Sequence, residues 1–192
     1  MISSRLVDGV NPRDDAQSHI GLDAGKTKMP APIKPGGRLI HSCGVFPMAD
    51  PEGIYNWHRL DSRITTSGQP TEAQLAEIRG LGVRHIVNLG LHTHEKALPD
   101  EAATVDRLGM TYIHIPVDFQ NPTEQDFEQF CTVMERLKDA PVHVHCIANA
   151  RVSAFFYRFR RDVLGMDEAQ ARAEMEAVWQ PKGVWVEFVK RR

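Results

Sequence analysis

A cysteine and an arginine flank a short turn in the run Val142-His143-Val144-His145-Cys146-Ile147-Ala148-Asn149-Ala150-Arg151. Residues 141–145 alternate as a buried strand does. Residues 151–164 have the apolar spacing of a helix, with one buried face formed by Val152, Phe155, Phe156, Phe159 and Val163. Backbone N–H groups in such a turn point at one spot, where the helix dipole also favours negative charge. A cysteine held there should exist largely as the thiolate, which is the reactive form. The pattern therefore predicts an anion-binding nucleophile.

Arg151 adds a planar fork of donors that suits two oxygens of a phosphate or sulfate. Simpler interpretations stay open for both residues. Cys146 could be an inert buried cysteine, and Arg151 could pair with a surface carboxylate. The position of the arginine inside the turn favours the chemical interpretation. Cys131 falls among apolar residues at helical spacing and is predicted to be a core residue.

The order His145-Cys146, then Arg151, resembles the His-Cys-loop-Arg signature of the cysteine-dependent protein tyrosine and dual-specificity phosphatases. Four residues separate Cys146 from Arg151, where the common form has five. Asn149 stands where the loop usually carries a glycine. Because Asn tolerates left-handed backbone angles better than most residues, the turn is expected to survive.

A second motif, Ser67-Gly68-Gln69-Pro70-Thr71, precedes an amphipathic helix and then strands at residues 83–89 and 112–117. This order resembles one bacterial branch, the beta-lactamase-hydrolase-like phosphatases, in which a four-residue loop is familiar. The resemblance covers roughly residues 54 to 180. It implies a dual-specificity-phosphatase-like fold and hydrolysis of phosphomonoesters through a cysteinyl-phosphate, with no cofactor.

The resemblance also implies roles for the residues of the loop. Cys146 would attack phosphorus, while Arg151 and the loop amides hold the phosphoryl oxygens. His145 would fix the loop and the thiolate through hydrogen bonds, without acting as a base. The hydroxyl expected directly after the arginine is displaced by one position. The predicted substrate-binding residues are His145, Ile147, Ala148, Asn149, Ala150, Val152 and Ser153.

Transfer to cysteine needs a proton donor for the leaving group. Asp118 follows the strand predicted at residues 111–117 and opens a loop at the sheet edge where Cys146 lies. By resemblance it stands in the region of the general acid. A solvated turn residue is the equal alternative, and Asp126 and Glu95 are the fallback donors.

Strands and helices alternate along residues 63–179, which predicts an α/β fold with a mostly parallel central sheet flanked by helices on both faces. Strands are expected at residues 63–66, 83–89, 111–117 and 141–145. Thr71 and Thr123 are expected to cap helices, and Asp167 to cap a last helix that ends at Trp179. Active sites in such sheets lie at the carboxyl ends of strands, where Cys146 is.

The chain has 192 residues, the length of about one domain. Residues 1–50 show no sustained periodicity and are predicted to be a disordered extension. Residues 51–192 are the predicted catalytic domain. A formal charge of −2 gives no electrostatic reason to expect nucleic acid or an acidic membrane. The predicted partner is a phosphorylated protein or small molecule.

Three cysteines do not suggest a disulfide framework, and no apolar run has the length of a membrane span. The first thirty residues lack the hydrophobic core of a signal peptide. These observations predict a cytoplasmic protein. They do not predict the oligomeric state.

Nine histidines raise the question of a metal site. His92 and His94 leave one strand, and His143 and His145 alternate on another, so two pairs could converge on zinc or iron. The anion loop already explains His145, however, and a histidine in the position of His143 is more often part of the core. No metal is therefore predicted.

Two other functions stay open. A rhodanese-like sulfurtransferase would carry a persulfide on Cys146 and need no general acid, and a pseudophosphatase would bind phosphorylated ligands without turnover. The sequence does not distinguish a phosphotyrosyl protein, a nucleotide, a phosphoinositide or a small metabolite as the substrate.

Overall fold

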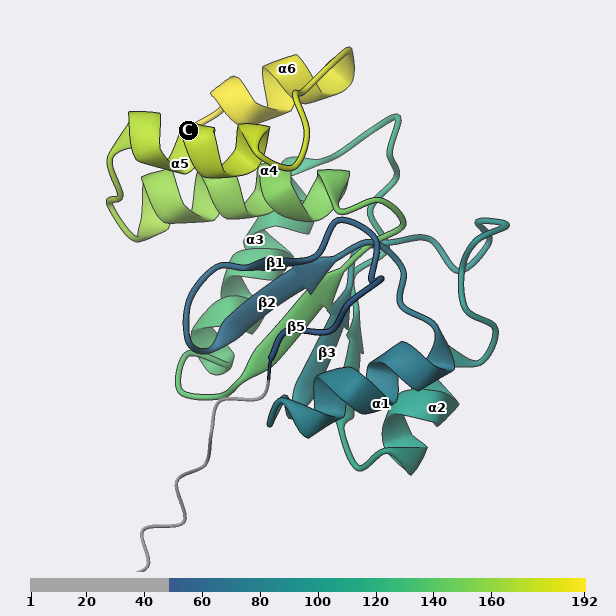
Figure 1. Cartoon of the computed structure of the whole chain (residues 1–192). Coiled ribbons are helices and arrows are strands. Elements are labelled where there is room, and N and C mark those ends of the chain that lie inside the picture. The colour runs from purple at the N-terminus through teal and green to yellow at the C-terminus, as the bar shows by residue number, and fades with distance from the viewer. Residues whose placement is uncertain (1–48) are drawn as a thin grey trace, which may run out of the picture. The chain divides into compact units, whose positions relative to one another are not determined.

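The structure is a computed structural model, and it describes residues 49–192. The extension predicted for residues 1–50 lies almost entirely outside these residues, so its disorder stays a prediction. Within the described part of the chain, one five-stranded sheet lies between two layers of helices (Figure 1). No helix among these residues has the length and apolar character that crossing a bilayer requires.

The sheet has the strand order β1-β2-β5-β3-β4. Only β1 runs antiparallel to its neighbour, and the other three pairings are parallel. The mostly parallel sheet predicted from the sequence is therefore confirmed. The strands are β1 (His58–Arg59), β2 (Ile64–Ser67), β3 (His85–Asn88), β4 (Thr111–His114) and β5 (Val142–His145).

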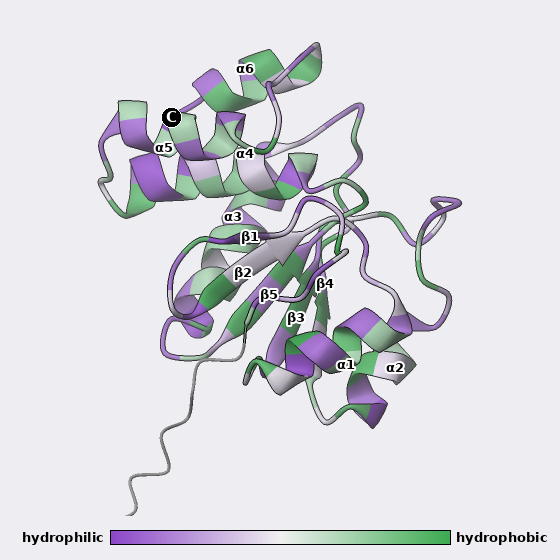
Figure 2. Cartoon of the chain, viewed as in Figure 1, coloured by the Kyte–Doolittle hydropathy of each residue, from purple (hydrophilic) through white to green (hydrophobic). Residues whose placement is uncertain are grey.

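Two short helices, α1 (Glu72–Gly80) and α2 (Glu101–Arg107), cover one face of the sheet (Figure 1). The predicted capping box begins α1, because the Thr71 hydroxyl accepts from the Gln74 amide and the Gln74 side chain accepts from the Thr71 amide. Along α1 and α5, hydrophobic and hydrophilic residues alternate (Figure 2). The smaller of two apolar clusters lies under α1 and α2: Ile54, Leu75, Ile78, Val83, Ile86, Val105 and Met110.

The other face is covered by α3 (Glu124–Arg136), α4 (Ala150–Arg158), α5 (Glu168–Glu176) and α6 (Val184–Lys190), which enclose the larger core (Figure 1). Thr123 and Asp167 cap α3 and α5 as predicted. Phe130 lies at the centre of this packing, because its ring makes T-shaped contacts with the rings of Phe155, Phe156 and Phe159.

The helix predicted at residues 151–164 changes its winding. After α4 the chain forms a π-helical turn, Phe159–Val163. A wider turn rotates the residues that follow it away from the 3.6-residue stripe. Val163 was expected on the buried face, but 52% of its surface is exposed, so this prediction was wrong. Val152, Phe155, Phe156 and Phe159 are buried as expected.

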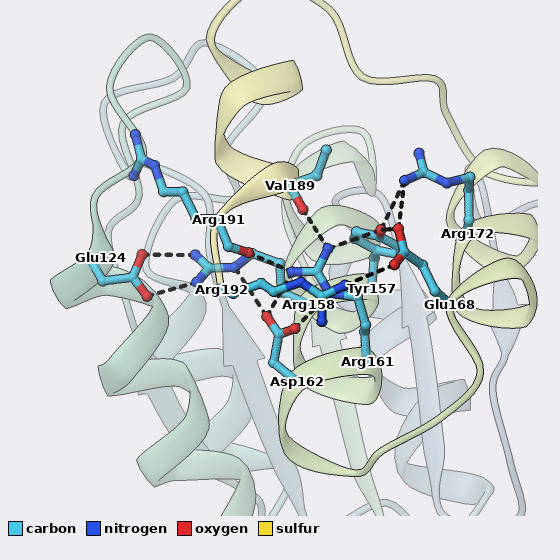
Figure 3. A network of polar contacts seen from close by, with 10 residues as sticks. All are labelled: Glu124, Tyr157, Arg158, Arg161, Asp162, Glu168, Arg172, Val189, Arg191 and Arg192. Carbon is cyan, nitrogen blue, oxygen red and sulfur yellow. Dashed lines mark hydrogen bonds and ion pairs between the residues drawn. The ribbon is translucent and has the colours of Figure 1, made fainter.

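The helix capped by Asp167 ends at Glu176 and is followed by another helix, α6, which the sequence analysis did not predict. A network of arginines attaches α6 to the rest of the layer (Figure 3). Arg161 donates to the backbone oxygens of Val189 and Arg191. The Arg158 guanidinium lies 3.9 Å from the ring centroid of Phe127 and 4.8 Å from that of Phe188, and binds Glu124 with two hydrogen bonds.

Candidate active site

Cys146 follows the last residue of the central strand β5, and α4 begins four residues later. Its side chain is fully buried. The strand end is fixed on both sides, because the Cys146 amide donates to the Ser67 oxygen and the Leu89 amide donates to the His145 oxygen. Cys131, by contrast, is half-buried on α3, and burial raises the pKa of its thiol to about 11. The described residues thus place one cysteine at the predicted turn.

Asn149 adopts a left-handed conformation, with φ 65°, directly before α4. Its side-chain amide donates to the Asn56 oxygen at 2.8 Å and to the Thr66 hydroxyl at 3.1 Å. Asn56 returns the contact by donating to the Ala148 oxygen at 3.0 Å. An asparagine therefore supplies both the turn geometry that glycine would allow and a clamp that glycine could not make.

Arg151 occupies the second residue of α4 and is 5% exposed. Its guanidinium carbon lies 5.1 Å from the ring centroid of Phe119. Among residues 49–192 it forms no ion pair, and its buried Nε has no hydrogen-bond partner. The alternative in which Arg151 pairs with a surface carboxylate is therefore not found in the described structure.

The next two residues of α4 turn away from the loop. Val152 is fully buried in the larger core. The Ser153 hydroxyl donates to the Ala150 oxygen at 2.9 Å and borders a cavity of about 20 Å³ between α4 and α5. The hydroxyl of Ser153 is thus engaged by its own helix.

The Ser-Gly-Gln-Pro-Thr motif packs directly on the cysteine loop. A Cβ atom on Gly68 would lie 2.8 Å from the Tyr55 ring and 2.9 Å from the Ile147 oxygen, so a larger side chain has no room. The Gly68 amide donates to the Tyr55 oxygen, and the Gln69 amide donates to the Ile147 oxygen. The motif therefore shapes the loop from the side of β2.

A hollow of about 350 Å³ opens beside the loop. Half-exposed Ile147 and Ala148 form its wall on the loop side. The exposed Tyr55 and Lys96 bring an aromatic ring and a positive charge to the same hollow, and Gln69 completes the lining.

Asp118 lies in the loop after β4 and is exposed. Its carboxylate accepts from the Gln120 amide at 2.9 Å, as in a turn. The neighbouring Phe119 lies under the Arg151 guanidinium and accepts at its backbone oxygen from the Trp185 indole at 2.9 Å. The structure therefore brings the predicted acid loop to the arginine of the predicted nucleophile loop. Asp126, a fallback donor, is engaged in the capping box of α3.

His143 is a core residue, as the sequence analysis expected. Its two ring nitrogens lie 3.0 Å from the hydroxyls of Thr65 and Ser67, and Trp57 stacks on its ring. Burial lowers its pKa well below 6.5, so the imidazole is neutral. His92 instead stacks on His114 at 3.7 Å. Within residues 49–192 no three histidine, cysteine or acidic side chains are grouped to hold a metal ion.

Glu101 is a residue of this region that the sequence analysis missed. It begins α2, is 3% exposed, and approaches His145 to 3.1 Å. Burial opposes its ionisation, but the charge of nearby His145 and hydrogen bonds from Gln69 and Tyr112 together lower its pKa. A buried carboxylate thus lies next to the residue that precedes the candidate nucleophile.

Residues 50–186 match the family described as DSP-PTPase phosphatase fused to NAD+ kinase. The beta-lactamase hydrolase-like protein of Agrobacterium fabrum is 29% identical over 101 residues, which make up 51% of this chain and 23% of that protein. The chain therefore spans less than a quarter of the length of this curated relative.

Two solved structures extend the comparison. A DUF442 protein from Shewanella putrefaciens, a candidate phosphatase, is 32% identical with a TM-score of 0.64, and the match covers 72% of this chain and 88% of that one. TpbA from P. aeruginosa is 19% identical with a TM-score of 0.60, and the match covers 74% and 87%. The second likeness concerns the fold alone.

Proposed function

Because the chain belongs to the DSP-PTPase phosphatase family, we propose that it hydrolyses phosphomonoesters through a cysteinyl-phosphate on Cys146. The observation that carries this proposal is the turn between β5 and α4. That turn presents a buried cysteine together with a buried arginine whose guanidinium no carboxylate among the described residues neutralises. Such a pair matches a nucleophile and an oxyanion clamp.

In the proposed reaction the Cys146 sulfur forms a bond to phosphorus as the bond to the leaving oxygen breaks. Arg151 and the loop amides hold the phosphoryl oxygens, and Asp118 protonates the leaving oxygen. Water then attacks phosphorus, the sulfur–phosphorus bond breaks, and inorganic phosphate and the thiolate are released. These steps need no cofactor.

The hollow lined by Tyr55 and Lys96 is the proposed place for the leaving group. A cation beside the loop favours substrates that carry a second acidic group, and an exposed ring offers a face for stacking. Related folds bind chemically different phosphates: a TpbA variant is known in complex with phosphotyrosine, and PTPMT1 in complex with PI(5)P. Both kinds of ligand remain candidates for this chain.

The direct test replaces the nucleophile. Cys146→Ser should abolish phosphate release from an aryl phosphate, because the hydroxyl is a poor nucleophile of similar size. Cys131→Ser, a change of the half-buried cysteine on α3, is the matched control and should retain turnover. Undiminished hydrolysis by Cys146→Ser would point to a different mechanism.

The same preparations separate the other functions. Sulfur transfer from thiosulfate, with no release of phosphate from esters, would favour the rhodanese-like reaction. Binding of phosphate without any turnover of esters would favour a pseudophosphatase. We expect phosphate release that is unaffected by chelators.

A further inference from the structure

The carboxylate of Glu101 is the most completely enclosed acidic group near the cysteine loop. Its Oε1 atom accepts from the Gln69 side chain at 2.8 Å and lies 3.1 Å from His145 Nε2. Its Oε2 atom accepts from Asn88 at 2.8 Å and from the Tyr112 hydroxyl at 3.1 Å. Both oxygens therefore have two partners, from four different segments of the chain.

A carboxylate buried to this degree is costly unless a cation compensates its charge. Among residues 49–192 no lysine or arginine forms an ion pair with Glu101. Gln69, Asn88 and Tyr112 contribute neutral donors, so the imidazole of His145 is the one partner that can carry a positive charge. The lowered pKa of Glu101 is consistent with that arrangement.

The partners of Glu101 are also the segments that fix the cysteine loop. The Gln69 amide donates to the Ile147 oxygen, and Leu89, next to Asn88, donates to the His145 oxygen. His145 itself precedes Cys146. Removing the charge of Glu101 would therefore alter the contacts of three backbone segments that fix the cysteine loop: those at Gln69, at Asn88 and at His145.

We propose that Glu101 is a positioning residue that holds His145 as an imidazolium and so fixes the end of β5 that presents Cys146. The inference rests on the proposed role of Cys146 as the nucleophile. His145 is adjacent to Cys146 along the chain, whereas Glu101 reaches it through the imidazole. A positive charge on the residue that precedes Cys146 favours the thiolate.

Other titratable groups surround the carboxylate. Burial, and then the charge of Glu101, raise the pKa of Tyr112, so its hydroxyl remains a neutral donor. His92 lies 2.8 Å from that hydroxyl and stacks on His114, whose pKa is lowered chiefly by burial. In the proposed arrangement none of these groups replaces His145 as the cation beside Glu101.

The test measures alkylation of Cys146 by iodoacetamide against pH, with the modified peptide identified by mass spectrometry. Glu101→Gln keeps the shape of the side chain and removes its charge. Without the carboxylate, His145 should lose its proton at neutral pH, so the positive charge that favours the thiolate is lost. The pH of half-maximal alkylation should therefore rise by about one unit. At neutral pH, kcat/KM should fall about tenfold, the rate equivalent of one pH unit. Tyr112→Phe removes a neutral donor from the same carboxylate and should retain the wild-type alkylation profile.

Alkylation requires no turnover, so this result is independent of the proposed phosphatase reaction. An unchanged alkylation profile in Glu101→Gln, even with lost activity, would show that Glu101 is merely structural and would overturn the inference. Should this variant fail to fold, nitrogen-15 NMR of the wild-type histidines decides the matter. Two protonated ring nitrogens on His145 at pH 7 support the inference, and a neutral imidazole overturns it.

Discussion

Arg151 is held by an aromatic ring, which leaves its donors free of internal acceptors among the described residues. A ring contact of this kind orients the plane of a guanidinium without occupying the donors at its edge. In the proposed reaction this arrangement leaves the guanidinium edge available to the phosphoryl oxygens, so the shape of the side chain should contribute together with its charge.

Arg151→Lys should lower kcat/KM about tenfold to hundredfold, because a point charge loses the two-pronged hydrogen bonding to phosphate. Inhibition by vanadate should weaken in parallel. Steady-state kinetics with an aryl phosphate would measure both effects. Wild-type values in the lysine variant would show that Arg151 does not bind the phosphoryl oxygens.

Asp118→Asn should slow alkyl phosphates by about a hundredfold or more, which is the usual contribution of a general acid. An aryl phosphate with a good leaving group barely needs protonation and should be affected far less. Glu95→Gln tests the exposed fallback donor, and it should leave both substrates unaffected if Asp118 is the acid. Equal slowing of both substrates by Asp118→Asn would assign the acid to another residue.

At the scale of single residues, the sequence analysis predicted those members of the candidate site that lie close together along the chain. Cys146, Asn149 and Arg151 belong to one strand-turn-helix segment, so their arrangement follows from local pattern. Glu101 could not be predicted in the same way, because it meets His145 only when β3 and β5 pair and α2 packs against them. The Gly68 contact with Ile147 has the same origin.

At the scale of elements, α6 connects the arginine network to the candidate acid loop. Arg161 holds the backbone at the end of this helix (Figure 3). Trp185, near its beginning, donates to the Phe119 oxygen. The helix has only seven residues, too few for a clear periodic pattern in the sequence. The π-helical turn before α5 was missed for a related reason, since it departs from the 3.6-residue period.

Trp185→Phe should keep the packing on Phe119 and remove the indole donor. We expect kcat for alkyl phosphates to fall about threefold to tenfold, the equivalent of one hydrogen bond, with a smaller change for aryl phosphates. Trp179→Phe is the matched control, since Trp179 contacts the same ring without an indole hydrogen bond to that loop. Identical behaviour of the two variants would argue against a role for the Trp185 indole in placing the loop.

At the scale of the whole molecule, His143 couples stability to pH. Its pKa in the folded protein lies well below 6.5, its ordinary value, because the side chain is fully buried on the central strand β5. Below pH 6.5 the unfolded chain takes up a proton that the folded protein excludes. The contribution of His143 to the free energy of unfolding is therefore fully present above pH 6.5, and it is lost as the pH falls toward the folded pKa.

Urea denaturation at pH 7.5 and pH 5.5 measures this dependence. The loss contributed by His143 approaches, at most, about 1.4 kcal/mol per pH unit. His143→Gln should be less stable at pH 7.5, because the contacts with Thr65 and Ser67 change, yet its stability should vary less over this interval. A variant with the wild-type slope would assign the pH dependence to other groups, such as His85 and His114, whose pKa values burial also lowers.

The position of β5 in the sheet has a consequence for how the chain folds. This strand is the last of the five in the sequence, yet it inserts between β2 and β3, so both of its pairings join distant segments. Distant pairings form slowly, because the intervening chain must first be ordered. The thiol of Cys146 should therefore stay accessible to solvent until late in refolding. The time at which this thiol becomes protected would then report when the sheet closes.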